Sequence, residues 1–160
     1  MRENDPVASS VTSSSYLLAG SHVPLKIKTS IRQGDYIELG HMEPKTDPSS
    51  KVGLTLSSSS VSLQPTRAPK AANRDQWLRW FNTFAAIYTS SFPDAAPEIF
   101  TYVNNVLALF QNPNYTFRQV LKYDEDFRWA KSVVPSMPWH RINVQILLNS
   151  STSALSLIHI

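Results

Sequence analysis

The sequence predicts an all-α protein: a small helical bundle of three main helices plus a short fourth, preceded by a largely disordered Ser/Pro-rich N-terminal arm. Three observations indicate this class. After Asn73, large apolar residues recur at the three- and four-residue spacing of α-helices. Residues that favour helix N-termini stand before each periodic segment. Before Asn73, long tracts contain mainly Ser, Thr, Pro and Lys, and the 160 residues fit one domain with such an arm.

Two segments of the N-terminal half, residues 1–15 and 45–72, carry few large apolar side chains. So little apolar surface does not offset an ordering cost of roughly 1–2 kcal/mol per residue, and we expect both segments to be disordered. Between them, residues 16–44 should form a short helix and then an extended docking segment, because Pro24 suits a first helical turn and Gly34 a helix end. This block is too small to hold its own core, so it should pack on the rest of the chain or on a partner.

The first long helix should begin after Asn73, a residue that caps helix N-termini, and run to about Ser90. At about 100° per residue, its large apolar side chains cover an arc of roughly 120°. This stripe comprises Trp77, Trp80, Phe81, Phe84, Ile87 and Tyr88.

The second helix should follow Asp94 as its cap, with Pro97 in its first turn. Phe100 and Leu107 widen its apolar face, so we expect this helix to lie at the centre of the bundle, covered from two sides. The face itself comprises Ile99, Tyr102, Val103, Val106, Leu109 and Phe110.

The third helix should begin after a turn at residues 112–114, where Thr116 and Gln119 can form a capping box. It should extend to about Val134, because Pro135 stops it. Its buried stripe comprises Phe117, Val120, Leu121, Phe127 and Val134.

A short fourth helix is expected from Ile142 to Leu148, which completes a bundle over residues 73–149. Across the three main helices, the predicted core comprises Trp77, Trp80, Phe81, Phe84, Ile99, Val103, Val106, Phe110, Phe117, Leu121 and Phe127.

The stretch YDEDFRWAK, residues 123–131, puts three consecutive acids on the third helix. Asp124 falls near the middle of the buried stripe, while helical winding turns Glu125 and Asp126 away from it by about 100° and 200°. Side chains that diverge in this way do not converge on one metal ion or one proton. A helical metal site would instead need acids three or four residues apart with a histidine nearby.

Arg128 and Lys131 follow Asp124 by four and seven residues, on the same side of the helix. We therefore predict a structural ion pair of Asp124 with Arg128 and Lys131, with an indole N–H of the first helix as a further donor. Such a group determines how helices pack more than it adds stability. Because loss of Arg128 would leave the carboxylate uncompensated, we expect Asp124→Leu to be better tolerated than Arg128→Ala.

Residue patterns that carry chemistry are scarce in this sequence. The absence of cysteine excludes disulfides and thiolate metal sites within it. The four glycines are isolated and form no phosphate loop, and the serines form no nucleophile elbow. We therefore predict a protein that is not an enzyme, with no catalytic residue, metal site, cofactor or small-molecule substrate.

The charge pattern and the N-terminus bear on partners and location. The 15 basic and 12 acidic residues are spread almost evenly, so the clustered basic excess that marks a strong phosphate-binding surface is weak. The N-terminus lacks the apolar run of a secretory signal, and no segment approaches the roughly 18 apolar residues that cross a bilayer. We expect an intracellular protein, cytoplasmic or nuclear, that does not contact a membrane.

Three pieces of the chain resemble one group of proteins. The pieces are VPLKIKTSIRQGDYIEL, QWLRWFNTFAAIYTSSFPDAAPEIFTYVNNVLALF and YDEDFRWAKSVVPSMPW. Together they resemble the gag-like N-terminal region of invertebrate retroelements, particularly DIRS-type elements that encode a tyrosine recombinase. The most specific part is the motif Tyr123-Asp124, Phe127-Arg128 and Ala130, and the likeness extends in pieces over residues 16–145.

The resemblance implies a non-enzymatic protein that self-associates or packages element RNA. In that group a zinc knuckle of cysteines and histidine often follows, and this chain has no cysteine. We also expect the chain to be C-terminally truncated. Its last six residues, LSLIHI, equal the translation of a sequencing adapter in the frame CTG-TCT-CTT-ATA-CAC-ATC, so residues 150–160 are interpreted as a non-native tail. The alternative is a natural apolar C-terminus.

Two functions follow from these observations. The first is an assembly module that forms a homo-oligomer, because the bundle has more large apolar side chains than about 75 residues can bury. The second is a module that binds RNA or single-stranded DNA by stacking and charge. Its candidate contacts are Arg79, Arg128, Trp129 and Arg141, assisted by the basic segment of residues 26–32, whereas Trp77 and Trp80 lie on the apolar stripe and are assigned to the core.

Overall fold

The computed structural model describes residues 18–44 and 68–158, and within them every regular element is a helix. The predicted all-α class is thereby confirmed. The predicted disordered segment 1–15 lies outside the described residues, as do most of segment 45–72 and the last two residues of the tail. No helix in the described ranges is long and apolar enough to cross a membrane.

The N-terminal block, which we define as residues 18–44, contains α2 (Leu25–Arg32) and the 3-10 helix η1 (Leu39–Met42). Pro24 stands at the N-cap of α2, and Gly34, at a φ of 85°, turns the chain after its end. Residues 35–38 then run to η1 without regular structure. The predicted helix and docking segment are both present, and both α2 and η1 pack on the next helix.

The first long helix, α4 (Arg74–Ser91), begins as its sequence indicates. The side chain of Asn73 accepts a hydrogen bond from the Gln76 N–H at 2.8 Å, which satisfies a backbone donor of the first turn. The predicted stripe is confirmed in full, because every one of its members is buried: Trp77, Trp80, Phe81, Phe84, Ile87 and Tyr88.

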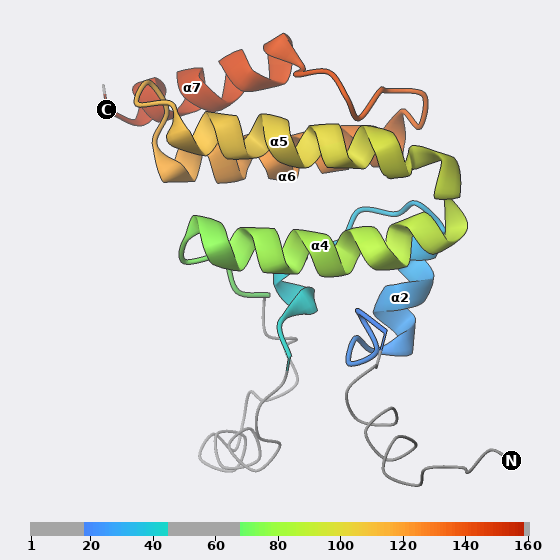
Figure 1. Ribbon diagram of the computed structural model, residues 1–160. Helices are drawn as coiled ribbons and strands as arrows, with labels where there is room; N and C mark the ends of the chain where they lie inside the picture. Colours follow the sequence, from blue (N-terminus) through green and yellow to red (C-terminus); the bar gives the residue numbers. More distant parts are fainter. Residues whose placement is uncertain (1–17, 45–67, 159–160) are drawn as a thin grey trace, which may run out of the picture.

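The second helix, α5 (Ala96–Gln111), follows a 3-10 turn, η2 (Pro93–Ala95). The prediction that Asp94 caps it was wrong, because Asp94 lies within η2 and Ala95 occupies the cap position. The prediction of a central position was also wrong, since Phe100 is 71% exposed. Instead, α4 is the helix covered on two sides, by the N-terminal block and by α5 (Figure 1).

The third helix, α6 (Phe117–Val133), has the predicted capping box. The Gln119 N–H donates to Thr116 Oγ1 at 3.1 Å, and the Thr116 N–H donates to Gln119 Oε1 at 2.7 Å. Val134 is half exposed and does not belong to the buried stripe, because the helix has ended and Pro135 turns the chain away.

The fourth helix, α7 (Val144–Ile158), is longer than predicted. The expected helix ran from Ile142 to Leu148, whereas α7 begins two residues later and continues to Ile158. Asn143 accepts a hydrogen bond from the Ile146 N–H at 3.0 Å at its start. The helix packs on α6, on the side of the molecule opposite the N-terminal block (Figure 1).

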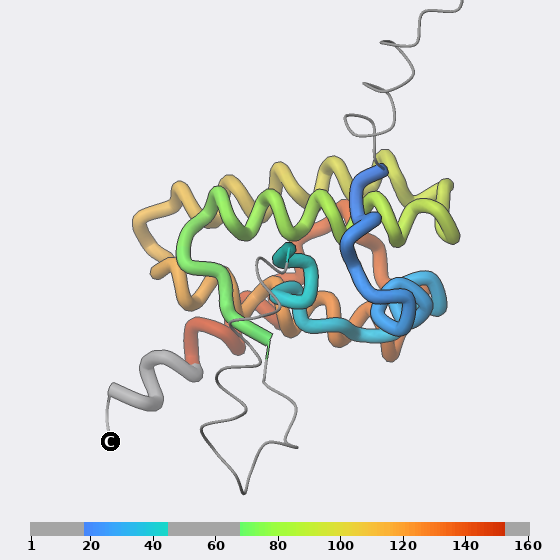
Figure 2. Tube along the Cα trace, turned by 90° about the horizontal axis from the view of Figure 1, so that it is seen from below, coloured from blue at the N-terminus to red at the C-terminus, as the bar shows by residue number. Residues whose placement is uncertain are grey.

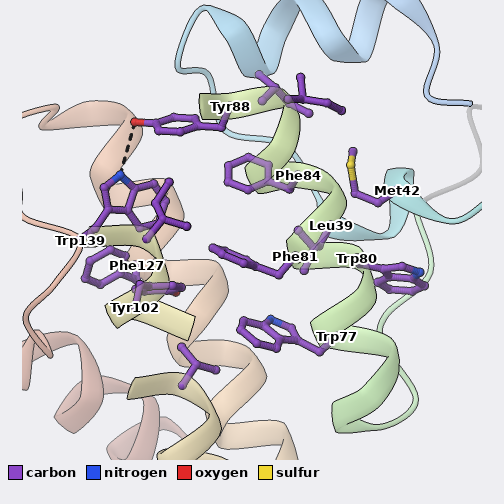
Figure 3. Close-up of a cluster of buried hydrophobic side chains, with 14 of the residues drawn as sticks. Leu39, Met42, Trp77, Trp80, Phe81, Phe84, Tyr88, Tyr102, Phe127 and Trp139 are labelled. Carbon is purple, nitrogen blue, oxygen red and sulfur yellow. Dashed lines mark hydrogen bonds between the residues drawn. The ribbon is translucent and has the colours of Figure 1, made fainter. Parts of the chain in front are cut away.

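The core lies on both sides of α4 (Figure 3). On one side, Ile31, Leu39 and Met42 of the N-terminal block pack against α4. The chain before α4 packs closely on η1 at Gly40, where an added Cβ would lie 2.1 Å from the Pro69 carbonyl oxygen, so a glycine is required there. Figure 2 shows η1 and the segment before α4 side by side.

On the other side of α4, the indole of Trp139 is the centre of an aromatic cluster. Its ring centroid lies between 5.1 and 6.5 Å from those of Phe81, Phe84, Tyr88, Tyr102 and Phe127. Of the predicted core, Val103, Phe110, Phe117 and Leu121 are only partly buried, and the other members are fully buried.

Candidate functional site

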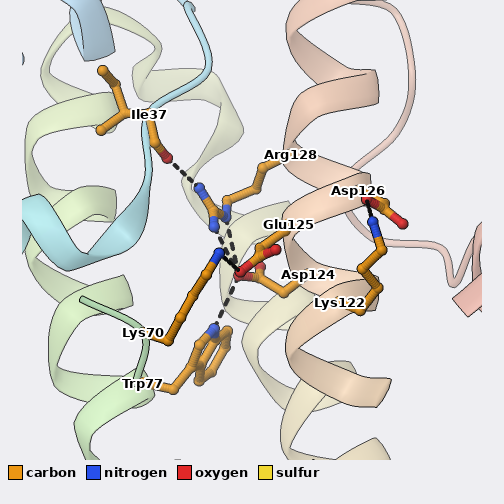
Figure 4. Close-up of polar contacts among 8 residues, drawn as sticks. All are labelled: Ile37, Lys70, Trp77, Lys122, Asp124, Glu125, Asp126 and Arg128. Carbon is orange, nitrogen blue, oxygen red and sulfur yellow. Dashed lines mark hydrogen bonds and ion pairs between the residues drawn. The ribbon is translucent and has the colours of Figure 1, made fainter. Parts of the chain in front are cut away.

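The three consecutive acids of α6 point to three different partners (Figure 4). Asp124 is turned into the core and is 1% exposed. Glu125 pairs with Lys70, in the segment before α4, at 2.6 Å, and Asp126 pairs with Lys122 of its own helix at 2.9 Å. The predicted divergence of these side chains is confirmed, and the reason is helical winding alone.

Both carboxylate oxygens of Asp124 accept hydrogen bonds from buried donors. The indole N–H of Trp77 donates to Oδ2 at 3.1 Å, and the hydroxyl of Tyr102 donates to Oδ1 at 2.6 Å. Arg128 donates to Oδ2 through Nε at 3.1 Å, and its Nη2 lies 3.0 Å from the same oxygen. The predicted ion pair with Arg128 and the predicted indole donor are both present. One carboxylate thus joins α4, α5 and α6.

Arg128 extends the network into the N-terminal block. Its Nη1 donates to the carbonyl oxygen of Ile37 at 2.7 Å, across 91 residues of sequence. Its guanidinium carbon lies 5.4 Å from the centre of the Tyr36 ring and 5.9 Å from that of Phe84, distances at which a cation is attracted to a ring face. The same side chain therefore neutralises Asp124 and holds the docking segment.

The predicted role of Lys131 was wrong. Its ammonium donates to the carbonyl oxygens of Pro135 and Met137, at 2.5 and 2.6 Å, and lies 5.8 Å from the Trp139 ring centre. Seven residues place it nearly two turns from Asp124, where the loop that follows α6 offers the Pro135 and Met137 carbonyl groups to a cation. Partial burial lowers the pKa of Lys131, and the charge of Glu98 opposes this shift.

The electrostatics of the network follow from burial beside charge. Burial, the Asp124 charge and the hydrogen bond to Asp124 raise the pKa of the Tyr102 hydroxyl well above its ordinary value. Burial alone would lower the pKa of Arg128, yet the adjacent Asp124 carboxylate outweighs burial and raises it. Tyr102 is thus held protonated as a donor, and Arg128 is held charged.

This arrangement determines what the site can do. A carboxylate that is 1% exposed and accepts from an indole, a hydroxyl and a guanidinium is positioned to hold helices together. Among the described residues, no group of three or more His, Cys, Asp or Glu side chains is close enough together to hold a metal ion.

The candidate nucleic-acid contacts lie on separate elements of the fold, and one of them is buried. Arg128 is 4% exposed, so its assignment as a surface contact was wrong: its guanidinium serves Asp124 and Ile37. Arg79, Trp129 and Arg141 are exposed, on α4, on α6 and before α7. Trp77 and Trp80 are buried, as their place on the stripe indicates.

Sequence reasoning missed two members of the site and one residue of the aromatic core beside it. Tyr102 was assigned to an apolar face without a partner for its hydroxyl, although a buried tyrosine usually needs one. The carbonyl of Ile37 had no signal, since a backbone acceptor is chosen by the path of the chain. Trp139 was noted only as the last residue of a motif. It follows Pro135 and Pro138, which indicate a loop, so the sequence did not predict that its side chain is buried in the core.

Comparison of the chain with protein-family models, curated proteins and solved structures finds no match.

Proposed function

We propose that this chain is a non-enzymatic, gag-like assembly module that acts inside the cell by self-association of its helical bundle. One observation carries the proposal: Trp129 and Val133, one turn apart on α6, are 57% and 58% exposed. Large apolar side chains placed together on a surface favour a contact that removes them from water. The retroelement resemblance supports the same function.

The stripe that contains this pair has the spacing of a helix-pairing face. Lys122, Asp126, Trp129 and Val133 follow one another at intervals of four, three and four residues, which keeps them on one side of α6. The first two are joined in an ion pair at 2.9 Å, so the stripe has a polar end and an apolar end. In a two-fold contact both copies use the same surface, so the apolar pair of each copy is removed from water.

Self-association should be measured on the full chain by sedimentation velocity over a concentration series. The wild-type protein should show a mass that rises with concentration, and Trp129→Ser/Val133→Ser should stay monomeric with an unchanged thermal midpoint. Leu25→Ser is the matched control, because Leu25 is a similarly exposed apolar residue of α2 and should leave association intact. A strictly monomeric wild-type chain at high concentration would contradict the proposal.

The second candidate function is binding of single-stranded nucleic acid, and the exposure of the Trp129 ring is the observation that favours it. An exposed indole can stack on a base. Of the three arginines predicted as nucleic-acid contacts, Arg79 and Arg141 are exposed. Affinity for single-stranded RNA should then fall steeply with added salt and drop on Trp129→Ser. An absence of binding at low salt would remove this candidate and leave the assembly function untouched.

A further inference from the structure

A groove of about 510 Å³ lies where residues 33–37, the end of α4, η2 and the end of α6 meet. Its volume is in the range of sites that bind small molecules and peptide side chains. It is separate from the Trp129 and Val133 stripe, because neither residue lines it. Tyr88 and Trp139, labelled in Figure 3, form part of its wall.

Two of the aromatic side chains that line the groove are partly or largely accessible to solvent. Tyr36 is partly exposed, and Phe92 is 36% exposed with Tyr88 stacked on it at 4.5 Å between ring centres. The two walls touch at Gly34, where an added Cβ would lie 3.6 Å from the Phe92 ring. Asp35 directly follows Gly34, and Asp94 comes two residues after Phe92. Both aspartates line the groove beside this contact.

Some of the charged side chains that line the groove already have partners within the protein, and others do not. Arg128 is paired with Asp124 and donates to Ile37, and Lys131 donates to two carbonyl oxygens. Glu98 is paired with His140 at 2.5 Å. Asp35 and Asp94 are exposed, and their side-chain carboxylates make no hydrogen bond or ion pair with any other described residue. The charge left for a ligand is therefore negative.

We propose that this groove binds an arginine- or lysine-bearing peptide segment of a partner protein. A guanidinium or ammonium in the groove would be attracted to the exposed ring of Phe92 and would pair with the carboxylates of Asp35 and Asp94. An anionic ligand would meet those two carboxylates unpaired and would have to displace Lys131 from its carbonyl partners. The groove therefore selects a cation, independently of whether the bundle self-associates.

The test uses the full chain and a fluorescein-labelled peptide of alternating glycine and arginine, titrated at low salt by fluorescence anisotropy. Saturable binding that weakens with salt is expected, because partly exposed charge pairs are screened. Asp35→Asn/Asp94→Asn should weaken it at least about fivefold, the loss of two exposed ion pairs. Asp75→Asn is the matched control: Asp75 is an exposed acid at the opposite end of α4, and its loss should leave affinity unchanged.

Two further arms keep the result specific to the groove. Phe92→Ala should reduce affinity for the arginine peptide while thermal melting shows a folded protein. A fluorescein-labelled glycine–glutamate peptide, titrated separately, should show no saturable binding. The proposal is overturned if the arginine peptide does not bind, if Asp35→Asn/Asp94→Asn binds it as the wild type does, if Asp75→Asn weakens it equally, or if the glutamate peptide binds. Sedimentation of the same variants reports self-association separately.

Discussion

At the scale of single residues, the buried polar contacts that join the helices converge on Asp124. Its carboxylate is removed from water, which is costly, and the cost is offset only by the donors that surround it. Trp77, Tyr102 and Arg128 supply those donors from three helices. A change to any one of them therefore alters the environment of the others.

The buried position of Arg128 reverses the order of tolerance expected from the sequence. Asp124→Leu would leave a 4% exposed guanidinium without its counter-ion, and the Trp77 and Tyr102 donors without an acceptor. Arg128→Ala leaves a carboxylate that still accepts from Trp77 and Tyr102. We now expect Asp124→Leu to lose more stability, on the order of 3–5 kcal/mol, in urea unfolding.

A double variant separates the ion pair from its surroundings. Asp124→Leu/Arg128→Leu removes both charges together and should be more stable than Asp124→Leu alone, because no guanidinium is left unpaired. A larger loss of stability in Arg128→Ala than in Asp124→Leu would contradict this prediction. It would mean that the Arg128 guanidinium reaches solvent when Asp124 is replaced.

Tyr102 predicts how stability changes at alkaline pH. Its pKa in the folded protein lies well above 10, whereas in the unfolded chain it is about 10. The unfolded state therefore loses this proton first, and stability that is complete below pH 10 should fall as the pH rises above it. Urea midpoints measured from pH 8 to 11 should show this fall.

The matched variant is Tyr102→Phe, which keeps the ring and removes the hydroxyl. It should be less stable at pH 8 by about 1.5–3 kcal/mol, the typical contribution of a hydrogen bond to a charged group, and should show a shallower alkaline fall. Burial also raises the pKa of Tyr36, Tyr88 and Tyr123, so part of the fall should persist. An equally steep fall in Tyr102→Phe would show that its hydroxyl is not responsible.

At the scale of secondary structure elements, the helices begin where local hydrogen bonds favour it. The capping box of Thr116 and Gln119 satisfies backbone donors at the start of α6, and Asn73 does so for α4. These bonds join residues three apart in sequence and do not depend on the rest of the fold. They hold the register of α6, and with it the inward direction of Asp124.

Loss of the α6 cap should therefore be measurable by itself. Thr116→Ala should lower the free energy of unfolding by about 1 kcal/mol, the usual contribution of an N-cap hydroxyl. Thr101→Ala is the control: Thr101 is exposed inside α5 and bonds back to the Pro97 carbonyl, so alanine there should be neutral or slightly stabilising. Equal losses in the two variants would mean that the effect is not one of capping.

At the scale of the whole molecule, the N-terminal block completes the core. Ile31, Leu39 and Met42 cover the side of α4 that faces away from α5 and α6. The hydrogen bond from Arg128 to Ile37 and the ion pair between Lys70 and Glu125 join α6 to segments far away in sequence. The bundle and the N-terminal block thus share one set of buried contacts.

We predict that the bundle is not stable without this block. A chain of residues 68–158 would expose the side of α4 that carries Trp80 and Ile87, and the uncovered apolar area should lower its thermal midpoint and make it bind an apolar dye. A chain of residues 18–158 should melt like the full protein and bind no dye. Equal thermal midpoints of the two fragments would show that the N-terminal block does not contribute to the stability of the bundle.

The sequence alone was enough for the features that depend on near neighbours. The period of large apolar residues predicts α4 and its buried stripe without error, and the residue types at Asn73 and Thr116 predict where two helices begin. Helical winding likewise separates Asp124 from Glu125 and Asp126. These outcomes follow from backbone geometry within a few residues.

The tertiary structure decided which distant groups meet. Tyr102 and Ile37 join the site, and Trp139 joins the aromatic core beside it, because segments separated by tens of residues pack together. Lys131 does not join the site because the loop after α6 offers nearer acceptors. Phe100, which the sequence placed on a covered face, is exposed because α4 takes the central place. The physical reason is that the period of a helix specifies which side is apolar, whereas the packing of all helices together specifies what covers that side.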